Sequence, residues 1–212
     1  MSNMIPIPER GIYLASRSPR RRELLSQIGV RYHLLLFRER VGENPDVDEA
    51  VLAGEAPAAY VERMAKAKAE AGWRRMLQRN LPPAPVLAAD TTVALEGQIF
   101  GKPENRAAAE EILGALAGKR HEVLTAVAVK NYELLEAALS VSEVQIKALS
   151  KDEIAQYVAT GEADDKAGAY GIQGRAARFV IELRGSYSGV MGLPLYETSQ
   201  LLDKLRERRN PY

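Results

Sequence analysis

The stretch from Ile12 to Leu25, I-Y-L-A-S-R-S-P-R-R-R-E-L-L, constrains the fold more than any other part of the chain. Its apolar beginning predicts a short buried strand, and the residues Ser16 to Ser18 predict the turn that follows. Pro19 is favoured at the first position of a helix because its missing N–H needs no partner there. The stretch therefore predicts a strand, a turn and a helix in direct succession, with Ser18 as the N-cap.

The predicted helix carries positive charge at an unfavourable end. Arg20, Arg21 and Arg22 fill its first turn, where the helix dipole disfavours each cation by roughly a few tenths of a kcal/mol. Free backbone N–H groups and the hydroxyls of Ser16 and Ser18 lie beside these arginines. This combination favours a bound anion, above all a phosphate chain. A solvated basic turn without a ligand is the alternative.

Composition narrows the classes of function. The net charge of +1 over 212 residues argues against broad nucleic-acid binding, so any cationic site is local. The chain has no cysteine, which excludes thiolate nucleophiles and Cys-based metal sites. No apolar run is long enough to span a membrane, and the N-terminus lacks the apolar region of a signal peptide. We therefore expect a cytoplasmic protein without nucleic-acid or membrane partners.

Helical and strand-like patterns alternate along the rest of the chain. We expect strands at residues 30–37, 86–89, 93–95, 98–100, 123–130, 138–146 and 178–183, and helices at 58–79, 105–116, 150–159 and 194–208. This order predicts an α/β protein with a mixed sheet flanked by helices. We expect residues 1–212 to form one domain, in which residues 130–180 make a partly separate lobe. A cleft between the two lobes is then the expected place of a site.

Asp90 is the carboxylate that a phosphate site would need. It follows the apolar residues Val86–Ala89, so we expect it at the end of a short strand, where α/β sheets present functional groups. Capping the turn into Thr91 and Thr92 is the alternative. At a phosphoanhydride site this carboxylate would hold a divalent metal, for which Mg²⁺ is suited, or accept a proton from the attacking water.

Two lysines and a segment of small residues complete the candidate site. Lys68 interrupts an apolar helix face, where a snorkelling side chain is the alternative to an ammonium in a cleft. Lys102 has stiff flanks, G-K-P, which favours a point-charge contact. The segment Lys166–Gly174, K-A-G-A-Y-G-I-Q-G, would let backbone approach a ligand closely. In it, Tyr170 or Gln173 could meet a nucleotide base.

Six motifs, in order along the chain, resemble those of the Maf family of nucleoside triphosphate pyrophosphatases. They are L-A-S-R-S-P-R-R-R-E-L-L at Leu14–Leu25, M-A-K-A-K-A at Met64–Ala69, A-A-D-T at Ala88–Thr91, G-K-P at Gly101–Pro103, D-K-A-G-A-Y-G-I-Q-G at Asp165–Gly174 and G-L-P at Gly192–Pro194. Each is weak alone, but the six together are highly specific. The resemblance implies a fold similar to that of inosine triphosphate pyrophosphatases, a divalent metal (Mg²⁺ or Mn²⁺) and a homodimer.

The resemblance also implies the reaction and the roles of the site residues. The reaction is hydrolysis of a nucleoside triphosphate to the monophosphate and pyrophosphate, with Asp90 as proton acceptor. The motif Y-G-I-Q-G, which contains Gln173, resembles that of the family branch that acts on dTTP and UTP. Modified uridine triphosphates are further candidate substrates. An amide matches the O4 and N3–H edge of thymine or uracil because it offers a donor and an acceptor. Residues implied in substrate choice are Arg20, Thr91 and Gln173, and the implied phosphate-handling lysines are Lys68 and Lys102.

One region departs from the family pattern. Many members carry acidic residues just after the second strand, whereas this chain has Tyr32–Leu34 and then Arg38–Arg40. Glu39 or Glu43 is the candidate for a second metal ligand. The alternative function is a nucleotide-binding regulator of cell division with little hydrolysis. Such a binder would need the cations but not a carboxylate beside the scissile bond.

Overall fold

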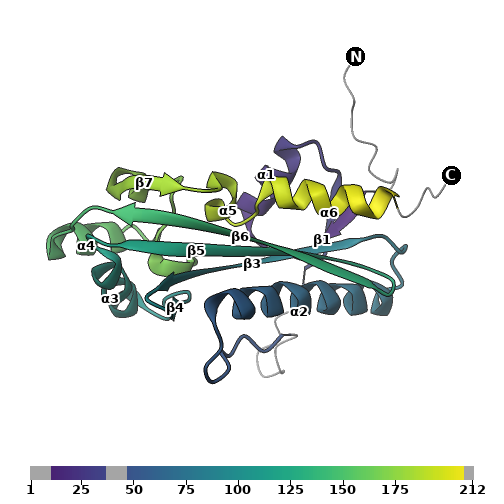
Figure 1. Ribbon diagram of the computed structural model, residues 1–212, viewed down its shortest axis with the longest axis horizontal. Coiled ribbons are helices and arrows are strands. Elements are labelled where there is room, and N and C mark those ends of the chain that lie inside the picture. Colours follow the sequence, from purple (N-terminus) through teal and green to yellow (C-terminus); the bar gives the residue numbers. More distant parts are fainter. Residues whose placement is uncertain (1–10, 37–46, 208–212) are drawn as a thin grey trace, which may run out of the picture.

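A mixed sheet of seven strands extends along the part of the chain that the computed structural model describes, residues 11–36 and 47–207 (Figure 1). The strands are β1 (Ile12–Leu14), β2 (Tyr32–Leu34), β3 (Val86–Leu95), β4 (Gln98–Phe100), β5 (Arg120–Asn131), β6 (Leu134–Ile146) and β7 (Val180–Arg184). Their order is β2-β1-β3-β5-β6-β7, and β4 pairs with β3. β1 is parallel to β2 and β3, and the other pairs are antiparallel.

Helices cover both faces of this sheet. They are α1 (Pro19–Gln27), α2 (Pro57–Gln78), α3 (Arg106–Leu116), α4 (Lys151–Val158), α5 (Tyr187–Met191) and α6 (Leu195–Glu207), with two short 3₁₀ helices, η1 (Ala167–Ala169) and η2 (Arg175–Phe179). α2 lies on one face, α1 and α6 lie on the opposite face, and α3 and α4 pack together at the end that carries β7 (Figure 1). Within the described residues, no helix combines the length and apolar surface needed to cross a bilayer.

The predicted fold class, a mixed α/β sheet flanked by helices, is confirmed. The predicted helices α2, α3, α4 and α6 form within one residue of their expected ends, apart from Arg208, which lies outside the described residues. β5 and β6 are longer than expected because a tight turn at Tyr132 and Glu133 joins them directly. The strand expected at residues 30–37 is shorter, and its last residue, Phe37, lies outside the described residues.

The expectation that Asp90 ends a short strand is wrong. β3 continues from Val86 to Leu95, and Asp90 pairs with Ala126 in the middle of the strand. Asp and Thr favour turns on local grounds. Here the continuous ladder with β5 satisfies the backbone groups on one side of the strand and keeps this part of β3 extended.

One edge of β3 is open around Asp90. β1 pairs with β3 only at Val86 and Leu87, and β4 pairs with it only from Val93 to Leu95. Among the described strands, none pairs with this edge between Leu87 and Val93. The last residue of β1, Leu14, pairs with Leu87, and the chain then turns into α1. The first turn of α1, which carries Arg20 to Arg22, therefore lies beside the open edge.

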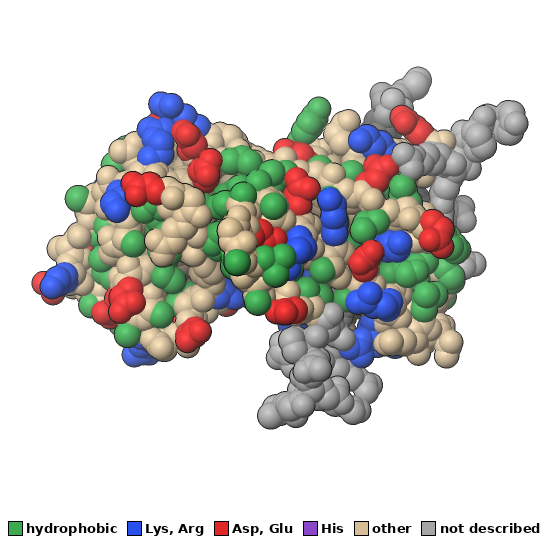
Figure 2. Space-filling model, turned by 60° about the horizontal axis from the view of Figure 1, so that its bottom comes forward, with side chains coloured by type: hydrophobic (Ala, Val, Ile, Leu, Met, Phe, Trp, Pro, Cys, Tyr) green, Lys and Arg blue, Asp and Glu red, His purple; other side chains and the backbone are tan. Residues whose placement is uncertain are grey.

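The alternation of side chains along β3 separates two sets of contacts. Val86 and Ala88 face α2, whereas Leu87 and Ala89 face α1 and α6. α2 lies very close to the sheet, since a Cβ on Gly72 would be 2.7 Å from a methyl group of Val86. The outer face of α2, brought forward in Figure 2, carries mixed basic and acidic side chains.

A buried histidine links β5 to the segment of small residues. His121 is 2% exposed, and its Nε2 lies 2.8 Å from the hydroxyl of Tyr170, with the two rings in edge-to-face contact. Burial lowers the pKa of His121 to about 4. The histidine is therefore neutral in the folded protein at neutral pH, and the pair is a structural contact between the two segments.

We expect this histidine to make the stability of the protein depend on pH. Between pH 6.5 and about 4 the unfolded chain binds a proton at His121 that the folded chain excludes. As the pH is lowered over this range, the free energy of unfolding should therefore decrease, and His121 should account for up to about 3 kcal/mol of the decrease. Chemical denaturation at several pH values should show a smaller fall in His121→Gln than in the unmodified protein. The control His33→Gln, at an exposed position of β2, retains His121 and should keep the full fall; an equal fall in both variants would contradict the assignment.

Candidate active site

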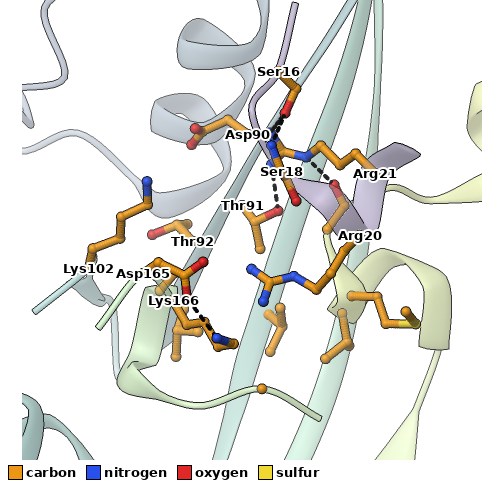
Figure 3. Close-up of a pocket in the computed structure, with 18 of the residues that line it drawn as sticks. Ser16, Ser18, Arg20, Arg21, Asp90, Thr91, Thr92, Lys102, Asp165 and Lys166 are labelled. Carbon is orange, nitrogen blue, oxygen red and sulfur yellow. Dashed lines mark hydrogen bonds and ion pairs between the residues drawn. The ribbon is translucent and has the colours of Figure 1, made fainter. Parts of the chain in front are cut away.

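A cavity of about 820 Å³ opens beside the free edge of β3. Its walls come from the β1–α1 turn, α2, β3, the segment after β4, the segment around η1 and the end of α5. Side chains of both charge signs point into it from different elements (Figure 3). All nine residues that the sequence predicted for the site line this one cavity: Ser16, Ser18, Arg20, Arg21, Lys68, Asp90, Thr91, Lys102 and Gln173.

Lys68 joins two carboxylates at the centre of the site. Its ammonium lies 2.6 Å from Oδ1 of Asp90 and 2.7 Å from Oε1 of Glu49. Of the two interpretations of Lys68, the ammonium in a cleft is the one observed. Burial opposes ionisation of Glu49, but the hydrogen bond and charge of Lys68, with the charge of Lys102, outweigh it and lower the pKa of Glu49. Glu49 therefore remains charged beside the ammonium of Lys68.

Sequence reasoning missed Glu49. The candidates Glu39 and Glu43 lie outside the described residues, whereas Glu49 lines the cavity. The available signal is the acidic run D-V-D-E at residues 46–49, shortly before the lysine helix. Contacts with α2 fix this part of the chain, because the hydroxyl of Tyr60 donates to the carbonyl of Glu49 at 3.2 Å and Arg63 donates to the carbonyl of Ala50 at 2.9 Å.

The guanidinium of Arg21 donates hydrogen bonds to three acceptors within the protein. Its Nε donates to the carbonyl of Gly192 at 2.7 Å, and its two terminal nitrogens donate to the hydroxyls of Ser16 and Thr91, each at 3.3 Å. Burial lowers the pKa of Arg21, an effect that the nearby charge of Asp90 opposes. Arg21 thus ties the β1–α1 turn to β3 and to the junction of α5 and α6.

A chain of hydroxyls continues from this arginine. Thr91 Oγ1 lies 3.0 Å from the hydroxyl of Thr125, which lies 2.7 Å from the carbonyl oxygen of Gly189. The hydroxyl of Thr125 is the donor in both contacts, so its one proton is shared between Thr91 Oγ1 and the carbonyl oxygen of Gly189. Thr91 therefore has defined partners on the α6 side of β3, opposite to the side that Asp90 faces.

Arg20 and Lys102 differ from Arg21 because their charges are available. Their cationic ends point into the cavity from different walls (Figure 3). Within the described residues, neither forms an ion pair or a side-chain hydrogen bond. Ser18 is the N-cap of α1, as predicted, but its side chain makes no capping hydrogen bond. The first turn of α1 thus keeps N–H groups that can bind an anion beside Arg20.

The wall around η1 carries Gln173 and the ion pair of Asp165 and Lys166. Gln173 is exposed and lines the cavity. Asp165 lies 2.6 Å from the ammonium of Lys166. Burial opposes ionisation of Asp165, but the hydrogen bond and charge of Lys166 lower its pKa overall. This wall of the cavity thus offers both amide and charged groups.

Fold and site together define an α/β protein with a nucleotide-sized cavity. The cavity offers free cations and a helix N-terminus for phosphates, and carboxylates close to them. The chain belongs to the Maf family: the family described as "Maf-like protein" matches residues 11–205. The resemblance seen in the sequence motifs is thereby confirmed.

Similar proteins carry a specific name. The chain is 59% identical to the dTTP/UTP pyrophosphatase of Aromatoleum aromaticum over 202 residues, which covers 94% of this chain and 97% of that protein. It is 55% identical to the dTTP/UTP pyrophosphatase of Nitrosomonas europaea over 193 residues, covering 91% and 93%. A solved structure, that of the Staphylococcus aureus Ham1 protein, matches with a TM-score of 0.46 and 17% identity over 94% of this chain and 99% of that chain.

We expect Arg21 to act as a structural cross-link of the site. Arg21→Lys should lower the free energy of unfolding by about 2 kcal/mol or more, because an ammonium cannot reproduce three directed contacts on three segments. Urea denaturation measures this. The neighbouring Arg22→Lys is the matched control and should change stability by less than about 0.5 kcal/mol; equal effects in the two variants would argue against the cross-link.

Proposed function

We propose that this chain is a nucleoside triphosphate pyrophosphatase that hydrolyses dTTP and UTP to the monophosphate and pyrophosphate. The observation that carries the proposal is the cavity itself, which is lined both by the Asp90–Lys68–Glu49 centre and by the cationic side chains of Arg20 and Lys102. Relatives 52–59% identical over most of their length bear the name dTTP/UTP pyrophosphatase. The fit of the cavity and the names of the relatives support the same reaction.

The geometry suggests how the residues share the reaction. Arg20, Lys102 and the N-terminus of α1 bind the triphosphate chain. Water attacks the α-phosphorus, a new P–O bond forms, and the bond from that phosphorus to the bridging oxygen breaks, so that pyrophosphate leaves. Asp90 accepts the proton of the water, and Lys68 holds its carboxylate in place at 2.6 Å. Positive charge around the phosphates stabilises the charge that develops in the transition state.

A divalent cation, Mg²⁺ or Mn²⁺, is the cofactor that we propose. Asp90 and Glu49 both contact the ammonium of Lys68, so two carboxylates that could bind a metal meet in one part of the cavity. Among the described residues, no group of three or more acidic or histidine side chains forms a complete metal site. Two carboxylates fit a metal that completes its coordination with phosphate oxygens and water, as Mg²⁺ usually does. When bound, the metal supplies further positive charge to the phosphates.

The wall around η1 is suited to recognise the base. Gln173 offers a donor and an acceptor to the O4 and N3–H edge of thymine or uracil. Modified uridine triphosphates would present the same edge and remain candidate substrates. A homodimer, implied by the family resemblance, and a cytoplasmic location, expected from the absence of membrane and signal segments in the sequence, stay predictions.

The alternative, a nucleotide-binding regulator with little hydrolysis, is less well supported. Such a protein would need Arg20, Lys102 and the helix N-terminus. It would have no use for two carboxylates beside these cations, because negative charge next to a triphosphate weakens binding.

We expect Asp90→Asn to reduce pyrophosphate release from dTTP by at least about 100-fold, since an amide cannot accept the proton. Pyrophosphate should be measured with Mg²⁺ and with Mn²⁺, and thermal unfolding should confirm that the variant folds. Asp152→Asn, the same change at an exposed position of α4, is the control and should retain full activity. Near-normal turnover in a folded Asp90→Asn protein would refute the assigned role.

We expect Gln173→Glu to change the choice of substrate. A carboxylate lacks the donor that the O4 oxygen needs, and an unmatched buried hydrogen bond costs about 1–3 kcal/mol, so kcat/KM for UTP should fall at least about tenfold. Gln156→Glu, the same change at an exposed position of α4, should leave this value unchanged. Unaltered relative rates over a panel of nucleotides would show that Gln173 does not read the base.

A further inference from the structure

Gln173 belongs to a short turn that has few contacts of its own. The turn runs from Gly171 to Arg175, and one backbone hydrogen bond closes it, from the N–H of Gly174 to the carbonyl of Gly171 at 3.0 Å. Gln173 makes no hydrogen bond within the described residues. Other parts of the protein must therefore fix the position of its amide in the cavity.

The carboxylate of Glu162 contacts one end of this turn directly and the other end through Tyr157. Glu162 Oε2 accepts the backbone N–H of Arg175 at 3.1 Å, and Glu162 Oε1 accepts the hydroxyl of Tyr157 at 3.3 Å. The same hydroxyl accepts the backbone N–H of Gly171 at 3.3 Å. Tyr157 is a buried residue of α4, so the clamp is anchored in the hydrophobic core.

The backbone of the turn lies directly against this clamp. A Cβ on Gly174 would be 2.0 Å from Glu162 Oε1, and a Cβ on Gly171 would be 2.7 Å from Cε of Lys166. Lys166 in turn donates to the backbone carbonyl of Glu162 at 2.6 Å. A side chain at either glycine would therefore displace the end of Glu162 or Lys166 from its present position.

We propose that Glu162, acting with Tyr157, is a positioning residue for substrate choice. It sets the place of Gln173 and so the discrimination between bases, although neither Glu162 nor Tyr157 lines the cavity. This inference rests on the proposed function, in which Gln173 reads the base. The clamp makes no described contact with Asp90, Lys68 or Lys102, so its loss should affect KM and selectivity more than kcat.

The test compares dTTP with dCTP. Cytosine carries an amino donor where thymine carries the O4 acceptor, so the pair reports on the placement of the Gln173 amide. In Glu162→Ala, KM for dTTP should rise and the ratio of kcat/KM for dTTP over dCTP should fall, each by about tenfold, while kcat for dTTP changes by less than about threefold. Tyr157→Phe, which keeps the aromatic core, should shift both values in the same direction and remains available if Glu162→Ala does not fold.

Glu153→Ala is the matched control. Glu153 closes the capping box of α4 and pairs with Lys147, so its loss weakens the same helix without touching the turn. Thermal unfolding of all variants separates stability from selectivity. A lower melting temperature in Glu162→Ala with an unchanged nucleotide ratio and KM, as expected for Glu153→Ala, would overturn the inference. If the unmodified protein itself does not prefer dTTP and UTP over dCTP, the proposed function fails instead.

Discussion

The contact between Lys68 of α2 and Asp90 of β3 is the interaction on which the site depends. A carboxylate only 9% exposed in the middle of a strand would be costly without a cation beside it. The small residues along β3 and Gly72 of α2 let helix and sheet approach until the ammonium reaches this carboxylate. The same ammonium also contacts Glu49, so one half-buried cation determines where two carboxylates meet the cavity.

The open edge of β3 explains why the site lies here. β1 is short and pairs with β3 only before Asp90, as far as Leu87, and β4 pairs with β3 only beyond Asp90, from Val93 onward. A longer β1 would pair with this edge and fill the space that the cavity occupies. The strand, turn and helix that open the chain therefore contribute in two ways. β1 ends early enough to leave the edge free, and α1 brings its cationic first turn to the gap.

Much of this could be predicted from the sequence, and the exceptions have physical reasons. Five helices, α1, α2, α3, α4 and α6, and the set of nine residues that line the cavity were predictable, because amphipathic periodicity, caps and short motifs are local signals. The place of Asp90 within a continuous strand was not, since the ladder with β5 overrides the local turn preference of Asp and Thr. Glu49 was missed because only the fold brings it to Lys68, a residue remote in the chain.

The three arginines of the first helical turn show how far residue type alone can mislead. They look equivalent in the sequence, yet Arg21 is committed to Gly192, Ser16 and Thr91, whereas Arg20 points its charge into the cavity. The structural arginine keeps the turn in place so that its neighbour can face an anion. Gln173 shows a similar arrangement, because the backbone on both sides of it is held by Tyr157 and Glu162, which lie outside the cavity. In both places, a side chain that lines the cavity depends on a second residue that fixes the segment around it, and only the fold reveals this second residue.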